Sequence, residues 1–123
     1  MILVDTNILI EIYRNNTLII DAVKKIGQDN IAVSDITCAE LYFGARNKSE
    51  LHVIANDFKK LEILHIQSEI SKNAVKLVER YTLSHKLDLP DALIAATAIY
   101  YKLPLFTLNV KDFVFIEGIQ LHK

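Results

Sequence analysis

The sequence predicts an α/β fold in which a mostly parallel sheet is covered by helices on both faces. Short apolar runs typical of buried strands alternate along the chain with longer segments whose apolar residues recur at helical spacing. This alternation is the pattern of consecutive βαβ units, in which a helix crosses from one strand to the next. The composition agrees, because 51% hydrophobic and 24% charged residues with three Gly and two Pro describe a compact chain without a linker or disordered tail.

Four runs are predicted to form the strands of this sheet, because each is short, apolar and bounded by polar or turn residues. They are ILV after Met1, IAV from Ile31, EILHI from Glu62 and LFTL from Leu105. A weaker candidate, GIQL, lies near the end of the chain. We therefore expect a sheet of four to five strands.

Six segments between these strands have apolar residues that share one face of a helix. The predicted helices cover residues 8–12, 19–26, 36–46, 51–61, 70–83 and 90–102. Local signals support these limits, namely a stop at Gly27, an N-cap at Ser34 or Asp35, and a first-turn proline at Pro90. The order of strands and helices is therefore that of a wound α/β sheet.

A chain of 123 residues is the size of a single domain, which we expect to span residues 1–123. The formal net charge of -1 argues against a strongly basic protein that binds nucleic acid without specificity, although it does not exclude a local binding site.

Cys38 is the only cysteine, so no intramolecular disulfide can form and a reducing compartment is expected. The longest apolar stretch, residues 92–101, is shorter than the ~20 residues of a membrane-spanning helix, and the N-terminus lacks a signal-peptide pattern. We expect a cytoplasmic protein that is neither exported nor anchored in a membrane.

Four acidic residues lie in segments that leave the carboxyl ends of predicted strands: Asp5, Glu40, Asp91 and Asp112. Three of them have an ordinary structural explanation, because Asp5 and Asp112 suit turns, and Asp91, three residues after Asp88, suits a capping box. Glu40 lies among apolar neighbours, so we expect it to be partly shielded from water and to face a cation.

In a parallel sheet these segments emerge at one edge, so the four acids should converge. Gathered carboxylates repel one another and raise one another's pKa values unless a divalent cation neutralises them. Ligands that are all oxygen, without His or Cys, favour Mg²⁺ or Mn²⁺ over zinc. Such a site can hydrolyse a phosphodiester with an activated water. Polar residues beside the acids are candidates to orient ligands or phosphate: Thr6, Asn7, Ser34, Thr107 and Asn109.

Three blocks of the sequence resemble a small stand-alone PIN domain, of the kind found as the toxin of VapBC-type toxin–antitoxin pairs. They are VDTNILIEIY, SDITCAELYFGAR and LPDALIAATAIYYKLPLFTLNVKDF, which together span nearly the full chain in the family's order. The resemblance implies a three-layer α/β/α fold and a Mg²⁺-dependent endoribonuclease whose acidic positions are Asp5, Glu40, Asp91 and Asp112. It also implies secondary roles for four polar residues: Thr6, Asn7, Thr107 and Asn109.

The resemblance further implies a homodimer, an RNA substrate and a cognate antitoxin that holds the nuclease inactive. Four apolar residues are candidates either for the dimer surface or for the core: Ile54, Phe58, Val75 and Val78. One position departs from the family pattern, because relatives commonly carry a basic residue where this chain has Leu108. No phosphate contact is implied at that position.

Three other interpretations of the acidic residues remain open at this point. A phosphorylatable receiver domain has a similar length, but it needs an acidic pair after the first strand, where Asp5 stands alone; a haloacid-dehalogenase-like phosphatase needs Asp where Asn7 stands. A PIN-like module with a vestigial site would bind RNA or protein without cleaving it. Arg14 and Arg46 are candidates for RNA contact, and Cys38 is expected to be packed rather than reactive.

Overall fold

The computed structural model describes residues 1–123 and confirms the α/β fold with a parallel sheet. The strands are β1 (Ile2–Val4), β2 (Ile31–Ser34), β3 (Glu62–Leu64) and β4 (Leu105–Phe106). They lie in the order β3-β2-β1-β4, and every neighbouring pair is parallel. Because the chain winds from β1 toward β3 and then returns to place β4 on the other side of β1, the winding reverses between β1 and β4. Open α/β sheets bind their ligands outside the carboxyl ends of the strands at such a point.

All six predicted helices are present. They are α1 (Thr6–Tyr13), α2 (Thr17–Ile26), α3 (Asp35–Phe43), α4 (Lys48–Phe58), α5 (Ser68–His85) and α6 (Leu89–Tyr101), with single-turn 3-10 helices η1 (Gln28–Asn30) and η2 (Val110–Asp112). The boundary between the third and fourth helices was predicted wrongly, because α3 ends before Gly44 and α4 begins three residues earlier than expected. The cause is Asn47, whose side chain accepts a hydrogen bond from the Glu50 N–H at 2.9 Å and so caps α4.

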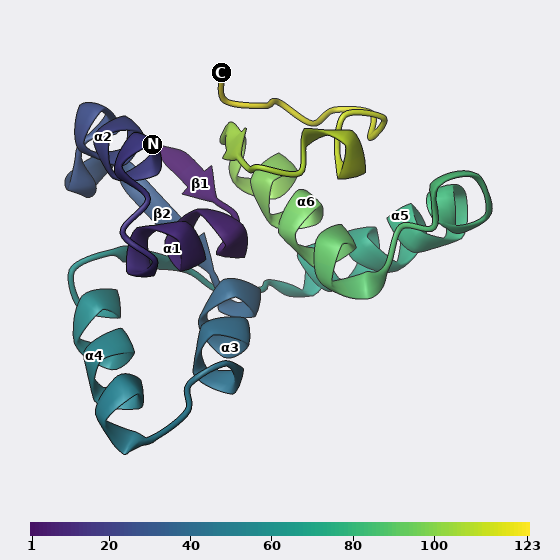
Figure 1. Cartoon of the computed structure of the whole chain (residues 1–123). Coiled ribbons are helices and arrows are strands. Elements are labelled where there is room, and N and C mark those ends of the chain that lie inside the picture. The colour runs from purple at the N-terminus through teal and green to yellow at the C-terminus, as the bar shows by residue number, and fades with distance from the viewer.

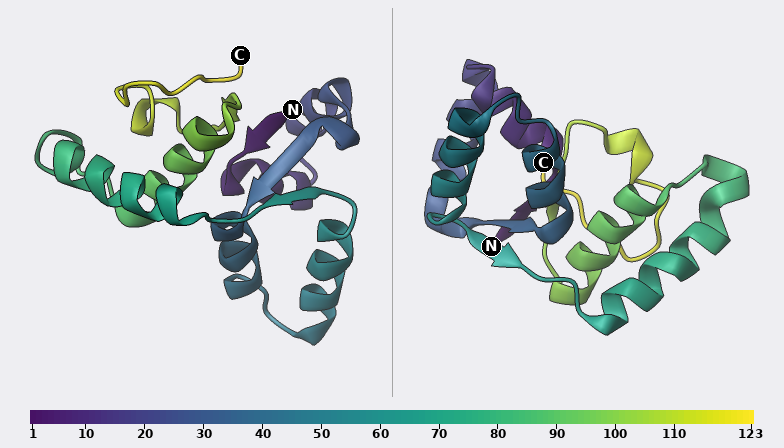
Figure 2. Two further views of the ribbon diagram at one scale, coloured as in Figure 1. Left: turned by 180° about the vertical axis from the view of Figure 1, so that it is seen from behind. Right: turned by 90° about the horizontal axis from the view of Figure 1, so that it is seen from below.

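The helices form two outer layers, so the predicted three-layer α/β/α arrangement is confirmed. Figures 1 and 2 show α1–α4 gathered on one side of the strands, with α5, α6 and the C-terminal segment on the other. Successive strand residues alternate between these layers. In β1, for example, Leu3 belongs to the core shared with α5 and α6, and Val4 belongs to the core shared with α1, α3 and α4. In both figures α3 and α4 form a helical hairpin that projects away from the sheet.

The predicted fifth strand at GIQL is wrong. Only an isolated bridge joins Leu121 to Leu105, with hydrogen bonds from the Leu105 N–H to the Gln120 carbonyl and from the His122 N–H to the Leu105 carbonyl, both at 2.8 Å. The reason is that β4 itself is only two residues long, which leaves its outer edge too short for a ladder. Gly118, at a φ of +88°, turns the chain just before this bridge.

Helix α6 forms the centre of the larger core. Its four fully buried alanines allow a close approach to α5: Ala92, Ala95, Ala96 and Ala98. Phe113, directly after η2, is wholly buried against the same core. Phe113 therefore anchors the C-terminal segment to the core around α6.

No helix combines the length and apolarity needed to cross a membrane.

Replacing Phe113 by Ala should destabilise the protein by about 3–5 kcal/mol, because a fully buried aromatic side chain is lost and a cavity remains. Phe43→Ala is the matched control, since Phe43 is 93% exposed and its loss should change the free energy of unfolding by less than about 0.5 kcal/mol. Urea unfolding followed by circular dichroism measures both. Equal midpoints for the two variants would contradict this assignment of the core.

Candidate active site

Asp5 is the buried carboxylate at the point where the winding of the sheet reverses. It follows β1 and is only 6% exposed. Its Oδ1 accepts a hydrogen bond from the Thr6 N–H at 2.7 Å, and its Oδ2 accepts one from the Thr107 hydroxyl, after β4, at 2.8 Å. Burial raises the pKa of Asp5, the two hydrogen bonds counteract this, and the charges of Glu40 and Asp112 raise it further. Asp5 is therefore more than a turn residue, because it joins the ends of β1 and β4.

Thr6 connects this strand end to α3. Its hydroxyl donates a hydrogen bond to Glu40 Oε1 at 2.6 Å and contacts the Thr37 hydroxyl at 3.0 Å. Thr37 is completely buried, so this contact fixes the start of α1 against α3. The Glu40 carboxylate is consequently held toward the end of β1 by a neutral donor.

Glu40 was expected to be partly shielded from water, and this expectation was wrong. Glu40 is exposed rather than shielded, because the neighbouring Ala39 and Phe43 also face solvent where the α3–α4 hairpin leaves the body of the protein. No Lys, Arg or His of the chain forms an ion pair with it. Its one hydrogen-bond donor within the chain is the Thr6 hydroxyl.

Asp91 lies in the first turn of α6, where Asp88 is the N-cap. The Asp88 carboxylate accepts a hydrogen bond from the Asp91 N–H at 3.1 Å, as predicted. The return bond of a capping box is absent, and the Asp91 carboxylate accepts no hydrogen bond at all. Burial, followed by the charges of Asp88, Asp5, Asp112 and Glu40, raises the pKa of Asp91 to about 7. Capping therefore does not account for this carboxylate.

Asp112 ends the short helix η2 and is half-buried. Its N–H donates to the Asn109 carbonyl at 2.9 Å, but its carboxylate caps nothing. Its charge raises the pKa values of both Asp5 and Asp91. The buried ring of Phe113 holds this segment in place beside the other acids.

The structure thus brings the four predicted acids into one neighbourhood at the carboxyl edge of the sheet. Each of the other three raises the pKa of Asp91, and none of the four takes part in an ion pair. They are not a closed cage, because no three Asp, Glu, His or Cys side chains are close enough together to hold a metal ion as they stand. The arrangement is a concentration of negative charge that no Lys or Arg neutralises.

These residues fit a hard divalent cation that keeps part of its water shell. All of the side-chain donors are carboxylate or hydroxyl oxygens, which suits Mg²⁺ or Mn²⁺. The Asp91 carboxylate is free of protein hydrogen bonds, and its raised pKa reflects negative charge that a cation would relieve. Mg²⁺ is usually bound by only one or two carboxylates together with water, so an open set of acids is compatible with it.

Thr107 links the polar residues predicted to surround the acids. Its hydroxyl donates to Asp5 and accepts hydrogen bonds from the Asn7 side-chain amide at 3.4 Å and the Asn109 N–H at 3.0 Å. The Asn7 side-chain oxygen in turn accepts the Leu108 N–H at 3.3 Å. Thr6, Asn7 and Thr107 are therefore parts of one network that orients Asp5. Asn109 takes part through its backbone.

Three other residues support the site. Ser34 is fully buried and caps α3 by accepting the Thr37 N–H at 3.3 Å, which confirms its prediction as an N-cap. Thr37 and Asp88 contribute to the site but were not predicted as site residues. Thr37 lies three residues before Glu40, so helical spacing could have placed it beside this acid. Asp88 likewise lies three residues before Asp91, so the same spacing could have indicated that its charge acts on Asp91.

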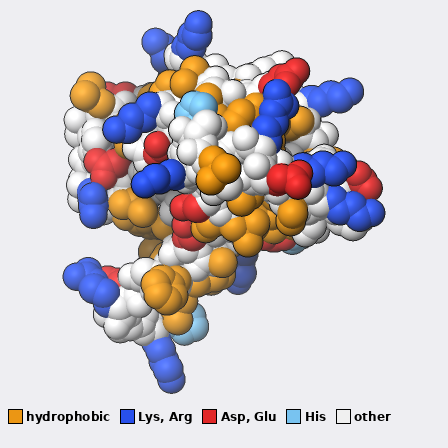
Figure 3. Space-filling model, turned by 90° about the vertical axis from the view of Figure 1, so that its right-hand side faces the viewer, with side chains coloured by type: hydrophobic (Ala, Val, Ile, Leu, Met, Phe, Trp, Pro, Cys, Tyr) orange, Lys and Arg blue, Asp and Glu red, His pale blue; other side chains and the backbone are white.

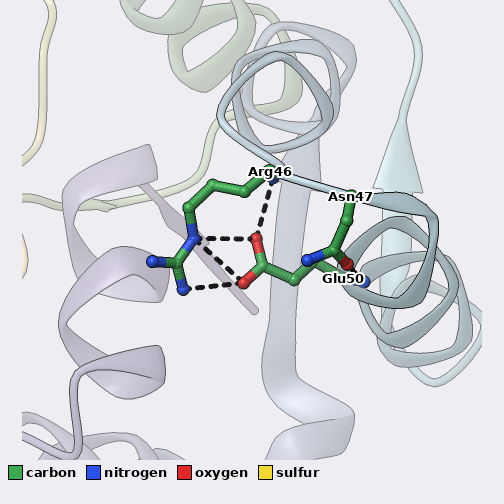
Figure 4. Close-up of polar contacts among 3 residues, drawn as sticks. All are labelled: Arg46, Asn47 and Glu50. Carbon is green, nitrogen blue, oxygen red and sulfur yellow. Dashed lines mark hydrogen bonds and ion pairs between the residues drawn. The ribbon is translucent and has the colours of Figure 1, made fainter.

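The two arginines considered for RNA contact are each paired within the chain. Arg14 contacts Glu11 at 3.2 Å, and Figure 4 shows the Arg46 guanidinium on Glu50, where Nη2 and Oε2 are 2.8 Å apart. On the face seen in Figure 3, Lys and Arg side chains are scattered among acidic ones rather than gathered in a basic patch. Leu108 is exposed and brings no charge to the site.

Cys38 is packed, as predicted. It is partly buried against the core of the α1–α4 layer, and burial together with the charge of Asp35 raises the pKa of its thiol to about 11. The thiol therefore stays protonated and has no role in the site.

Comparisons with known proteins agree on one family. The family model described as PIN domain matches residues 2–114. The chain is 34% identical over 125 residues to Ribonuclease VapC10 of Mycobacterium tuberculosis, covering 98% of this chain and 91% of the relative. It is 37% identical over 117 residues to Ribonuclease VapC1 of Methanocaldococcus jannaschii, covering 91% and 78%.

Solved structures of similar proteins share the fold. A toxin–antitoxin complex from Klebsiella pneumoniae contains a chain with a TM-score of 0.82 and 33% identity, covering 97% of this chain and 95% of that one. A chain of VapBC2 from Rickettsia felis, bound to a DNA fragment from its promoter, has a TM-score of 0.80 and 28% identity, covering 99% and 98%.

The raised pKa of Asp91 predicts a pH-dependent loss of stability in protein freed of metal by a chelator. Folded Asp91 binds its proton up to about pH 7, whereas the unfolded carboxyl has its ordinary pKa of 3.8. The folded state therefore holds more protons between these values, and the free energy of unfolding falls as the pH rises from about 4 to 7. Asp91→Asn should remove this slope and raise stability at pH 8 by about 1 kcal/mol. Urea unfolding at several pH values measures the effect, with Asp21→Asn on exposed α2 as the control.

The variant Asp88→Asn separates charge from capping in the same experiment. It keeps a side-chain oxygen for the Asp91 N–H but removes the second-largest cause of the raised pKa. The pKa of Asp91, followed by NMR, should fall in this variant while the helix cap is retained. An unchanged pKa in Asp88→Asn, or a wild-type slope in Asp91→Asn, would contradict the electrostatic description of the site.

Proposed function

This chain belongs to the PIN-domain family, and we propose that it is a metal-dependent endoribonuclease that acts as the toxin of a type II toxin–antitoxin pair. The observation that carries the proposal is the group of four acids without a counter-charge, placed where a wound sheet binds its ligand. The relatives named as VapC ribonucleases and the solved toxin–antitoxin complexes support the same function. Because the chain belongs to the PIN-domain family, the receiver-domain and dehalogenase interpretations are rejected.

The proposed cofactor is Mg²⁺, with Mn²⁺ as a substitute, and Asp5 and Asp91 are the residues expected to hold it most directly. When bound, such an ion supplies Lewis-acid polarisation of the phosphodiester and a position for the attacking water. Glu40 and Asp112 complete the site or orient this water. Asp5 stays aligned because Thr6 and Thr107 donate to its two oxygens. Asn7 steadies Thr107 from the other side, and the Asn109 backbone does the same.

In the proposed reaction, the water oxygen forms a bond to phosphorus and the bond from phosphorus to the 3′-oxygen breaks. The leaving oxygen takes up a proton, so the products are a 5′-phosphate and a 3′-hydroxyl. No side-chain nucleophile is needed, and Cys38 is excluded as one because its thiol stays protonated. The substrate is structured RNA, and the single unpaired cysteine suits action in the cytoplasm.

A cognate antitoxin and a homodimer belong to the same proposal, and the solved toxin–antitoxin complexes support the antitoxin. The apolar residues considered for the dimer surface divide in the structure. Ile54 and Phe58, both on α4, are buried in the core of the α1–α4 layer. Val78, on α5, packs partly against the core around α6. Only Val75 is well exposed, on α5, so it is the one of the four that remains available.

Asp5→Asn should abolish RNA cleavage while the protein stays folded. The amide oxygen can still accept the Thr6 N–H, but the negative charge is lost, so the effect should exceed the 10–100-fold typical of residues that only support a ligand. Cleavage of total RNA, and of stem–loop oligonucleotides derived from its products, measures the rate, with Asp21→Asn as the control. A vestigial PIN-like module would show no cleavage in the wild type, and Asp5→Asn with the wild-type rate would refute the assignment of the site.

Adding Mg²⁺ or Mn²⁺ to the metal-free protein should raise its melting temperature. The ion relieves repulsion among the acids, and at a few times its dissociation constant it contributes only about 1 kcal/mol. Asp91→Asn should remove most of this gain, whereas Asp21→Asn should retain it. A melting temperature that is indifferent to both ions in the wild type would count against a metal site here.

A further inference from the structure

A second polar cluster lies at the carboxyl edge of the sheet and is not used by the proposed chemistry. His65, directly after β3, places its Nδ1 at 2.8 Å from Oδ1 of Asp35, the first residue of α3. The other oxygen of Asp35 accepts the Ile66 N–H at 3.0 Å. Because an ionised carboxylate can only accept, Nδ1 is the donor, and Nε2 of the imidazole is left without a protein partner.

The register of the sheet places this pair on the same edge as the acids. Ser34 pairs with Leu64, so Asp35 and His65 extend β2 and β3 by one residue each, as Asp5 extends β1. The strand order then gives His65, Asp35, Asp5 and Thr107 in sequence along the edge. With strands ~4.8 Å apart, His65 lies roughly 10 Å from the end of β1. Its place is beside the group of acids, on the side away from β4.

The imidazole is both oriented and accessible. Asp35 fixes the ring, and the His65 carbonyl accepts a hydrogen bond from the Tyr101 hydroxyl at 3.0 Å, which holds the backbone from the side of α6. The His65 side chain is nevertheless 70% exposed. A side chain whose orientation is already fixed loses less conformational entropy when it binds a ligand than a free lysine does.

A positively charged side chain at this position can offset the repulsion between the acids and the RNA phosphates. RNA must bring its phosphates to an edge that carries four unpaired acids, and Leu108 supplies no cation on the β4 side. A protonated imidazole donates from both nitrogens, one to Asp35 and one to a ligand, so it can bind a phosphate oxygen while Asp35 balances its charge. The adjoining end of α5, where Gln67 provides no side-chain cap, adds partial positive charge on the same side.

We propose that His65, oriented by Asp35, binds a backbone phosphate of the RNA that flanks the scissile phosphate on the β3 side of the active site. This inference rests on the proposed nuclease function and adds a substrate-binding residue to it. Its separation from Asp5 identifies the ligand as a neighbouring phosphate rather than the one attacked. Asp35 is a positioning residue, since it acts on the substrate only through the imidazole.

The first test compares His65→Gln with the wild type on a stem–loop RNA oligonucleotide that the wild type cleaves. KM should rise about fivefold while kcat stays within twofold, because only substrate binding is affected. His65→Arg should restore KM, since a cation is supplied again. The control is His52→Gln, on α4, an exposed histidine without a protein hydrogen bond, which should leave both parameters unchanged. An unchanged KM in His65→Gln, or a fall in kcat alone, would overturn the proposal.

A second test changes the RNA instead of the protein, and the wild type alone can already contradict the proposal. Single phosphates flanking the cleaved bond are replaced one at a time by uncharged methylphosphonates. One of these replacements should raise the KM of the wild type about fivefold and have no further effect on His65→Gln. If none weakens binding, the His65 contact is excluded even when cleavage continues. If the wild-type protein cleaves no RNA, the proposed function fails and this inference fails with it.

Discussion

The structure depends on a buried carboxylate at the reversal point of the sheet. An isolated carboxylate with 6% exposure would cost several kcal/mol, and Asp5 avoids this cost because its two oxygens accept from opposite sides. One donor is the backbone at the start of α1, and the other is a hydroxyl that follows β4. The bond from Thr107 therefore also positions the loop after β4, and with it the chain that leads to Asp112.

The four acids of the site differ in how many hydrogen bonds their carboxylates accept. Asp5 accepts one hydrogen bond on each oxygen, Glu40 has one donor from Thr6, and the carboxylates of Asp91 and Asp112 have none. Because like charges without donors or counter-ions oppose folding, the outer acids lower stability at neutral pH. Helix caps and the tightly packed alanines of α6 stabilise the scaffold that carries them. Such a division between a stabilising core and a destabilising site is common in proteins whose site binds a charged ligand.

Much of the fold could be predicted from the sequence because strand and helix periodicities alternate clearly, and the parallel topology then places all strand ends on one edge. The prediction failed where tertiary contacts decide the outcome. GIQL has the composition of a strand but faces a two-residue edge, and the α3–α4 boundary depends on the cap formed by Asn47. Glu40 was expected to be shielded because its sequence neighbours are apolar. In the structure Leu41 is buried, whereas Ala39 and Phe43 are exposed on a projecting hairpin, a geometry that sequence periodicity does not contain.

The same contrast applies to the site. The positions of Asp5, Glu40, Asp91 and Asp112 follow from topology, whereas the pair formed by Asp35 and His65 does not, because its members are separated by 30 residues and no sequence motif contains both. Only the register between β2 and β3 makes them neighbours. Since an edge that gathers carboxylates for a metal also repels the phosphates of its substrate, positive or donor groups are needed just outside the acids. In this chain, where Leu108 leaves the β4 side uncharged, the oriented imidazole after β3 meets that requirement on the opposite side.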